Sequence, residues 1–454
     1  MSQSLQCFKA YDVRGRVPDQ LNPEIAFRIG QAFAQVIAPK RVVVGHDIRL
    51  SSESIKAGLV DGLTTAGVDV LDIGLCGTEE MYFATSHLTA DGGIVVTASH
   101  NPEDYNGMKF VRAGSRPISG DSGLRDIQAL AETGDLLSAA QRGAITTVST
   151  RDDYVQHLLG YVDVDALRPM TIVCNAGHGG AGLVIDALAP HLPQIRWVKL
   201  CHEPDGTFPA GVPNPLLVEN RAETAEAVIA EQADLGIAWD GDFDRCFFFD
   251  HQGQFIEGYY IVGLLASIFL ARDSGGKIVH DPRLYWNTEE QVALGGGETV
   301  VSKTGHAFIK ETMRAVDAVY GGEMSAHHYF REFFYCDSGM IPWLLIVSLL
   351  SRERQPLAAL VADRTNAYPC SGEINCVVAD PAALFAAVEE RFRPIAKTID
   401  HLDGLDIECD DWRFSLRSSN TERVVRLNVE TRRDTGLMRD KTADLIALIE
   451  AYAE

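Results

Sequence analysis

The pattern that most constrains this chain is a short apolar strand followed by a small or polar turn. Such strands occupy residues 92–96, 171–175 and 277–280, and helical patterns alternate with them. One helix is signalled by Asn22 and Pro23, an N-cap followed by proline at the first helical position. Strands that alternate with helices predict mostly parallel sheets. The spacing of roughly a hundred residues is too long for a solenoid, so we expect three related α/β domains.

The last section, after residues 368–369 (Tyr-Pro), changes character. Its strand candidates are residues 374–378, 412–416 and 424–429, between helices near 382–392 and 441–452. This pattern predicts a smaller C-terminal α+β domain with an antiparallel sheet. The expected domains are therefore residues 1–147, 148–252, 253–366 and 367–454, the first three being α/β with mixed or parallel sheets.

Composition narrows the function classes. Acidic residues outnumber basic ones 63 to 40, for a net charge of −23, which argues against nucleic-acid and anionic-membrane partners. The nine cysteines include no CxxC pair, so we expect neither disulfides nor structural zinc. No apolar run is long enough to span a membrane. Together these features predict a cytoplasmic protein.

The strand at residues 92–96 runs into Thr-Ala-Ser-His-Asn-Pro and so presents Ser99 at its carboxyl end. Ligands collect at the carboxyl ends of strands in α/β sheets, which makes this hydroxyl a candidate covalent carrier. A lipase-type nucleophile elbow is excluded because Thr97 and Asn101 stand where glycines are needed. A serine in an ordinary strand-to-helix turn is the alternative.

Three aspartates follow another buried strand, in the segment Asp-Gly-Asp-Phe-Asp-Arg at residues 240–245. In an extended loop alternate side chains face one way, so Asp240, Asp242 and Asp244 can converge on a hard cation. An EF-hand is excluded because Arg245 stands where that loop needs glycine. Oxygen-only ligands favour Mg²⁺ over zinc. A solvated acidic turn is the weaker alternative, because unneutralised carboxylates repel one another.

Two further loops carry polar side chains in useful patterns. Glu323, Ser325 and His327 occupy every second position, which suits the recognition of adjacent sugar hydroxyls; a plain surface loop is the alternative. Residues 417–421 (Arg-Ser-Ser-Asn-Thr), with Arg426 beyond, form a donor-rich set that suits a phosphate. The alternative for this second loop is a turn between the strands of a hairpin.

A competing function comes from a glycine motif at residues 177–182. It matches GxGxxG between a strand and a helix, and Glu203 follows at about the twenty-residue distance of a dinucleotide site. This reading predicts an NAD-dependent oxidoreductase. It explains neither Ser99 nor the three aspartates nor the loop at residues 417–421, so we rank it second.

In their order along the chain, these motifs resemble those of the α-D-phosphohexomutases. The matching segments are residues 11–15, 97–102, 205–209, 213–215, 240–245, 322–325 and 417–421, over more than 400 residues. Residues 323–328 (Glu-Met-Ser-Ala-His-His) look most like the bacterial phosphomannomutases of GDP-mannose and polysaccharide synthesis. The resemblance implies four domains around a central cleft. It also implies exchange of mannose 6-phosphate and mannose 1-phosphate through a phosphoserine and a hexose 1,6-bisphosphate activator, with phosphoglucomutase activity as an alternative.

The resemblance further implies a role for each site residue. By analogy, Ser99 carries the phosphoryl group and ligates Mg²⁺ together with Asp240, Asp242 and Asp244. Catalytic roles near the transferring group fall to Lys109 and Arg14, with Arg245 as a further cation and Tyr11 lining the site. The sugar would be held by Glu323, Ser325 and His327, and the unreacting phosphate by Arg417, Ser419, Asn420 and Thr421. His306 would contact the substrate, and Lys109 and His306 are the candidate acid and base.

The chain departs from the family pattern at two places. Glu422 is followed by Arg423 where the phosphate loop usually has proline, which puts the rigidity of that loop in doubt. Residues 77–80 (Gly-Thr-Glu-Glu) also lack the prolines that many relatives carry there.

Overall fold

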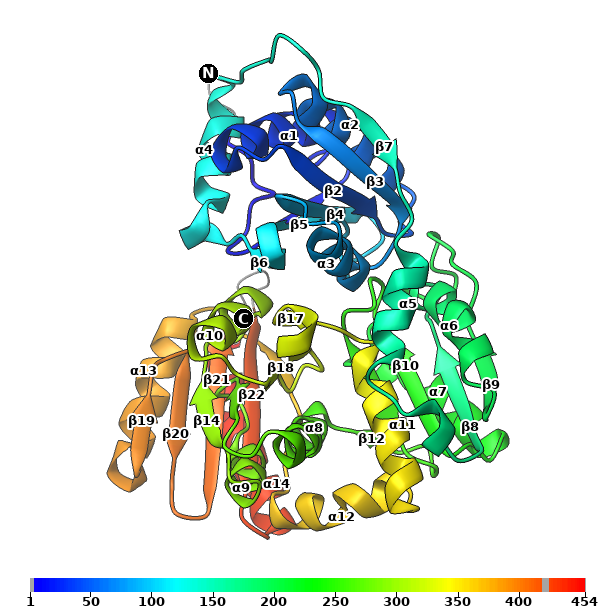
Figure 1. Cartoon of the computed structure of the whole chain (residues 1–454). Helices are drawn as coiled ribbons and strands as arrows, with labels where there is room; N and C mark the ends of the chain where they lie inside the picture. Colours follow the sequence, from blue (N-terminus) through cyan, green and yellow to red (C-terminus); the bar gives the residue numbers. More distant parts are fainter. Residues whose placement is uncertain (1–3, 419–423, 454) are drawn as a thin grey trace. The chain divides into compact units, whose positions relative to one another are not determined.

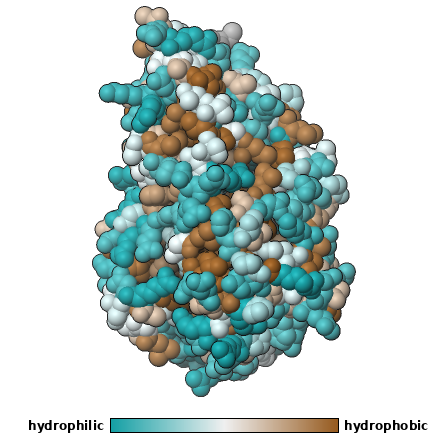
Figure 2. Space-filling view, turned by 45° about the vertical axis from the view of Figure 1, so that its right-hand side comes forward, coloured by the Kyte–Doolittle hydropathy of each residue, from teal (hydrophilic) through white to brown (hydrophobic). Residues whose placement is uncertain are grey.

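The computed structural model describes residues 4–418 and 424–453. The chain divides into two compact units (Figure 1). Unit 1 comprises Met1–Phe255 and Glu332–Arg354, and unit 2 comprises Ile256–Arg331 and Gln355–Glu454. Hydrophilic residues make up much of the face seen in Figure 2. Among the described residues, no helix combines the length and apolar character that a membrane span requires.

The first sheet of unit 1 is mixed rather than purely parallel. Its strands are β1 (Val13–Arg16), β2 (Arg41–His46), β3 (Asp69–Leu75), β4 (Gly92–Val96), β5 (Tyr105–Arg112), β6 (Arg116–Pro117) and β7 (Ile145–Thr147). They lie in the order β1-β5-β4-β2-β3-β7, with β6 paired to β5. Strands β4, β2, β3 and β7 run parallel, whereas β5 and β1 run antiparallel to their neighbours. The edge strand β7 falls in a stretch that the sequence pattern leaves without structure.

Helices cover both faces of this sheet (Figure 1). They are α1 (Pro23–Ile37), α2 (Ser52–Thr65), α3 (Thr78–His87) and α4 (Leu124–Thr133). The predicted start of α1 is confirmed, since the Asn22 side chain accepts a hydrogen bond from the Ile25 amide. Helices α1 and α2 pack so closely that a Cβ at Gly62 would lie only 2.1 Å from the Phe27 carbonyl oxygen, and glycine at this position permits the approach. On the other face, Gly93 lies equally close to α3, where its Cβ would meet Thr85.

The second sheet of unit 1 has the order β12-β11-β10-β8-β9. Its strands are β8 (Met170–Asn175), β9 (Ile195–Leu200), β10 (Leu235–Trp239), β11 (Cys246–Phe249) and β12 (Phe255–Ile256), with helices α5 (Arg151–Leu159), α6 (Ala181–Leu188) and α7 (Ala222–Ala230). The short strand β17 (Cys336–Asp337) and helix α11 (Ile341–Glu353) also belong to this unit. Helix α11 packs here through Trp343, which meets Trp197 edge to face at 5.7 Å between ring centroids.

Unit 2 contains a second pair of sheets. One has the order β14-β13-β15-β16, with strands β13 (Lys277–His280), β14 (Glu298–Val301), β15 (Tyr320–Gly322) and β16 (His328–Phe330). Its helices are α8 (Gly258–Arg272), α9 (Trp286–Leu294), α10 (His306–Val316) and α12 (Leu357–Ala367). Helix α8 is buried around most of its circumference, not on one face, because α9, α12 and β15 all contact it.

The C-terminal sheet is wholly antiparallel, in the order β18-β22-β21-β20-β19. Its elements are β18 (Ile374–Val377), β19 (Thr398–Asp400), β20 (Leu405–Glu408), β21 (Trp412–Ser418) and β22 (Val424–Thr431), with α13 (Pro381–Phe392) and α14 (Thr435–Glu450). Three α/β sheets and one antiparallel C-terminal sheet confirm the predicted fold class. The edge strand β19 and its neighbour β20 were not predicted, because such short segments lack a clear alternation of apolar residues.

Candidate active site

Ser99 lies just beyond β4 in unit 1 and is buried, with 4% of its surface exposed. Its Oγ donates to Asp240 Oδ2 at 2.9 Å and accepts from Arg245 Nη2 at 3.3 Å. The backbone φ of Ser99 is +51°, an uncommon conformation for a residue with a side chain. Such strain persists only where the surroundings enforce it, and it often marks functional sites. The hydroxyl is thus held against the aspartate loop rather than left in solvent.

Arg49 enforces this conformation from behind the serine loop. Its Nη2 donates to the carbonyls of Ser99 and Asn101, at 2.9 and 2.5 Å. Its Nη1 donates to the carbonyls of Pro102 and Tyr105, at 2.7 and 2.9 Å. One buried guanidinium therefore satisfies four main-chain acceptors of a single loop, a geometry that lysine cannot reproduce.

The three aspartates converge as the sequence predicts. Asp240, Asp242 and Asp244 are all buried, and each offers an oxygen within 4.8 Å of the others. Close packing shapes this loop. A Cβ at Gly241 would lie 2.8 Å from the Ser99 carbonyl. Gly179, on the segment before α6, approaches the other side, because its Cβ would lie 2.7 Å from the Gly241 carbonyl.

Two cations share this cluster. Lys109 Nζ lies 2.7 Å from Asp242 Oδ2 and also pairs with Asp244, while Arg245 Nε donates to Asp240 Oδ2 at 2.9 Å. Although burial opposes it, the charges of Asp242 and Asp244 raise the pKa of Lys109, so this amine remains protonated. Burial raises the pKa of Asp240 to about 6, against the opposing effect of Arg245. Two cations do not fully neutralise three carboxylates.

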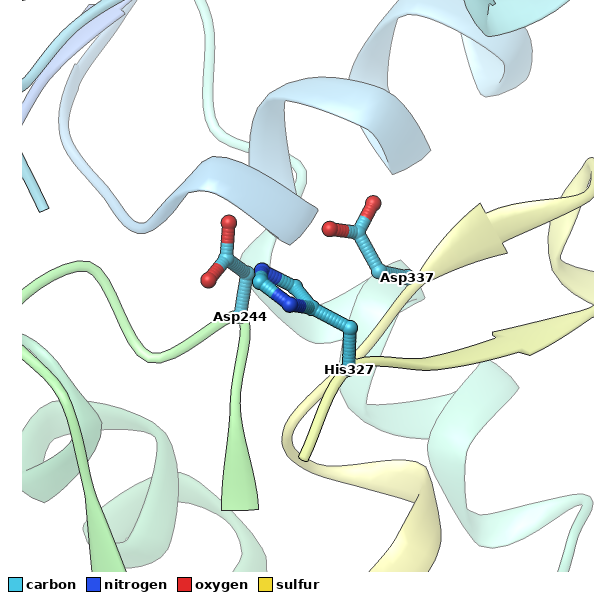
Figure 3. Close-up of side chains that lie close together, drawn as sticks. All are labelled: Asp244, His327 and Asp337. Carbon is cyan, nitrogen blue, oxygen red and sulfur yellow. The ribbon is translucent and has the colours of Figure 1, made fainter. Parts of the chain in front are cut away.

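The donor set fits a hard divalent cation. Asp242 Oδ1 is buried and makes no hydrogen bond to a described residue, so one ligand oxygen is available without breaking an existing bond. The other Asp242 oxygen accepts from Thr78 Oγ1 at 2.5 Å, which orients the carboxylate. A further carboxylate of unit 1, Asp337, has an oxygen within 4.8 Å of Asp244 (Figure 3). These residues form a buried acidic cluster that can bind a metal ion.

Arg14 and Tyr11 also belong to unit 1. Arg14 is anchored by Asp12, whose Oδ2 accepts from Nε at 2.7 Å, and it reaches the serine loop by donating to Asn101 Oδ1 at 2.6 Å. Although burial opposes it, the neighbouring Asp12 carboxylate raises the pKa of Arg14. Tyr11 is half-buried three residues earlier in the chain. Arg14 thus lies beside the loop that holds Ser99.

In unit 2, the structure brings Glu323, Ser325 and His327 together in one tight loop. His327 Nδ1 lies 3.6 Å from Glu323 Oε2 and 3.5 Å from Ser325 Oγ. Glu323 Oε1 also accepts from the Gly305 amide at 2.9 Å. This contact places His306, the first residue of α10, beside the same loop.

Arg283, which sequence reasoning missed, joins this loop to a group of arginines. Its Nη2 donates to Ser325 Oγ at 3.2 Å, and its Nη1 donates to Glu373 Oε2 at 2.9 Å. Arg417 and Arg426 face each other across β21 and β22, and Arg426 Nε lies 3.7 Å from Glu373 Oε1. Neighbouring guanidinium groups are stabilised by a bound anion, so this surface suits a phosphate. The other predicted phosphate ligands, Ser419, Asn420 and Thr421, lie outside the described residues.

The glycine motif at residues 177–182 has a structural explanation. Gly177 has φ +55° and its Cβ would lie 2.3 Å from Pro213, while a Cβ at Gly182 would lie 2.1 Å from the His202 carbonyl. The glycines thus allow the close approach of neighbouring protein segments. The alternative dinucleotide interpretation is not needed to explain them.

Comparison with known proteins identifies the family. Profiles described as phosphoglucomutase/phosphomannomutase match along the chain: alpha/beta/alpha domain I over residues 5–137, domain II over 152–253, domain III over 257–368 and the C-terminal domain over 373–447. The chain therefore belongs to the phosphoglucomutase/phosphomannomutase family, which confirms the resemblance seen in its motifs.

Individual relatives agree over almost the full length. The phosphomannomutase of Salmonella typhimurium strain LT2 is 60% identical, over 98% of this chain and 99% of its own length. That of Escherichia coli K12 is 56% identical over the same shares. Among solved structures, a phosphoglucomutase/phosphomannomutase family protein from Burkholderia thailandensis has a TM-score of 0.88 at 32% identity, covering 100% of this chain and 99% of that one.

Proposed function

We propose that this protein is a phosphomannomutase that interconverts mannose 6-phosphate and mannose 1-phosphate. The observation that carries the proposal is the buried Ser99 hydroxyl, hydrogen-bonded to Asp240 of a three-carboxylate cluster. The chain that carries this serine is 60% identical to the phosphomannomutase of Salmonella typhimurium strain LT2. In this proposal phospho-Ser99 donates its phosphoryl group to a sugar phosphate, giving a hexose 1,6-bisphosphate, and then accepts the other phosphoryl group. Free hexose 1,6-bisphosphate acts as the activator.

Unit 1 supplies the residues of phosphoryl transfer. A sugar hydroxyl oxygen bonds to phosphorus as the bond between phosphorus and Ser99 Oγ breaks. The hydroxyl proton passes to a general base, for which His306 is the candidate, and the protonated Lys109 is the candidate acid for Ser99 Oγ. Arg245 already donates a hydrogen bond to Ser99 Oγ, and Lys109 carries a second positive charge beside the aspartates. Asp240, Asp242 and Asp244 would hold Mg²⁺, which when bound neutralises negative charge on the phosphoryl group. Arg14 and Tyr11 would line the site next to the serine loop.

Unit 2 supplies the residues of substrate recognition. The Glu323 carboxylate would accept hydrogen bonds from vicinal sugar hydroxyls, and the Ser325 hydroxyl would donate to or accept from them. His327 and His306 would contact the same sugar. Arg417 would hold the phosphate that is not reacting, with Ser419, Asn420 and Thr421. Arg283 orients Ser325, since it donates to that hydroxyl. All nine cysteines are free thiols, in keeping with an enzyme that acts in the reducing cytoplasm.

A coupled assay tests this function. Mannose 1-phosphate and glucose 1-phosphate are compared with Mg²⁺ and a catalytic amount of hexose 1,6-bisphosphate, and we expect saturable turnover of mannose 1-phosphate that needs the bisphosphate. Turnover of glucose 1-phosphate without turnover of mannose 1-phosphate would make the enzyme a phosphoglucomutase. Titration with NADH should leave the nucleotide fluorescence unchanged, and saturable micromolar binding would instead support the oxidoreductase.

The clamp on the serine loop leads to a separate prediction for Arg49→Lys. Lysine keeps the charge but cannot donate to four carbonyls at once, so buried acceptors are left unpaired. We expect the free energy of unfolding to fall by about 2–3 kcal/mol. We also expect kcat to fall by about ten- to a hundredfold, because Ser99 is no longer held in position. Denaturant unfolding and steady-state kinetics measure the two effects.

The matched control is Arg41→Lys. Arg41 is exposed at the start of β2 and donates to the carbonyls of Leu88 and Thr89, each at 3.4 Å. These contacts are long and solvated, so we expect stability and kcat close to those of the parent. An Arg49→Lys enzyme with unchanged kcat would show that the clamp does not position the serine.

A further inference from the structure

Glu79 is a fully buried acid of unit 1 to which the proposed mechanism gives no role. It is the second residue of α3, and none of its surface is exposed. Its carboxylate accepts hydrogen bonds from Tyr154 Oη, from the Gly339 amide at 2.7 Å and from the Met340 amide at 3.4 Å. Burial raises the pKa of Glu79 to about 8. Keeping a carboxyl group here is costly, so its bonds to distant segments call for an explanation.

Glu79 lies at the start of α3, and this part of the helix supports the aspartate loop on one side. The Thr78 amide donates to the Asp242 carbonyl at 3.2 Å, and its hydroxyl donates to the Asp242 carboxylate. Gly77 packs on the Phe243 ring so closely that a Cβ there would lie 2.2 Å from it. Phe243 itself has φ +47°, so the loop is in a strained conformation that needs support.

The segment at Gly339 supports the same loop from another side. A Cβ at Gly339 would lie 2.3 Å from the Phe243 carbonyl and 3.0 Å from the main chain of Arg245. The Gly339 carbonyl accepts from Trp239 Nε1 at 2.9 Å, immediately before the first aspartate. The loop at residues 240–245 therefore packs against two supports, α3 and the Gly339 segment. Glu79 hydrogen-bonds from one support to the other.

We propose that Glu79 is a positioning residue that sets the metal affinity of the aspartate loop. It does so by fixing the separation of Thr78 and Gly339, and hence the directions of Asp240, Asp242 and Asp244. The inference rests on the metal-binding role assigned to these three aspartates under the proposed function. Partners that orient metal ligands without touching the metal commonly affect affinity by about 10–100-fold when removed.

The test is a titration of the full chain, freed of metal and without substrate, with Mn²⁺ followed by electron paramagnetic resonance. For Glu79→Ala we expect the dissociation constant for Mn²⁺ to rise about tenfold or more. For Glu79→Gln we expect a rise of about threefold or more, because the amide keeps one acceptor for Gly339 but loses the second. The glutamine variant preserves volume, and it tests the proposal on its own if the alanine variant does not fold.

The matched control is Thr85→Ala. Thr85 is buried in the same helix, and its hydroxyl bonds to the Met81 carbonyl without reaching the aspartate loop. The Thr85→Ala variant should have a lower melting temperature than the parent. Its Mn²⁺ dissociation constant should stay within about twofold of the parent value, since no metal-orienting partner is removed. An unchanged dissociation constant in the Glu79 variants, or an equal rise in the Thr85→Ala control, would overturn the role of Glu79. Failure of the parent chain to bind Mn²⁺ would instead refute the metal site, and with it this inference.

Discussion

Ser99→Ala will lower kcat by at least about a thousandfold, because a covalent carrier has no substitute in a mechanism that passes through it. Intact-mass measurement of the purified parent should show partial addition of one phosphate, and the variant should show none. The physical basis is the buried Oγ beside Asp240 and Arg245, which is positioned for transfer and shielded from water. The variant should still fold, since alanine removes one small polar group.

Ser54→Ala serves as the control for that experiment. Ser54 is an exposed residue of α2 in the same unit, and its hydroxyl donates to the Ser51 carbonyl at 2.9 Å. Both its mass profile and its kcat should match those of the parent. If Ser99→Ala retained full turnover, or still carried the phosphate, Ser99 would not be the carrier.

Removal of divalent metal will abolish activity, with a loss of about a hundredfold or more, and added Mg²⁺ will restore it. The reason is electrostatic, because Lys109 and Arg245 leave the three buried carboxylates incompletely neutralised. Asp242→Asn should cause a loss of similar size, since that residue holds the buried oxygen that makes no hydrogen bond to a described residue. Activity is measured in excess chelator and again after a Mg²⁺ titration.

The control for the aspartate is Asp61→Asn. Asp61 is an exposed residue of α2 that pairs with Arg142 at the surface, where such pairs contribute about 0–1 kcal/mol. It should leave both activity and its dependence on Mg²⁺ unchanged. Full activity of the parent in excess chelator would exclude a catalytic metal.

Sequence patterns predicted most of the secondary structure and the order of the motifs. The start of α1 follows from Asn22 and Pro23, and the placement of Ser99 follows from the buried strand before it. The convergence of the three aspartates follows from their alternate spacing. Each of these predictions depends on residues that are near neighbours in the chain, and for that reason a local pattern suffices.

The supports of the site were visible only in the tertiary structure. Arg49 reaches carbonyls about fifty residues away, Glu79 reaches Gly339 in a much later segment, and Arg283 links Ser325 to Glu373. The burial of α8 and the presence of β7 were likewise decided by packing against neighbours. A hydrophobic period specifies which face a segment buries, but not which distant segment covers it. Partners so far apart in the chain are chosen by the packing of whole elements, a long-range property that no window of sequence contains.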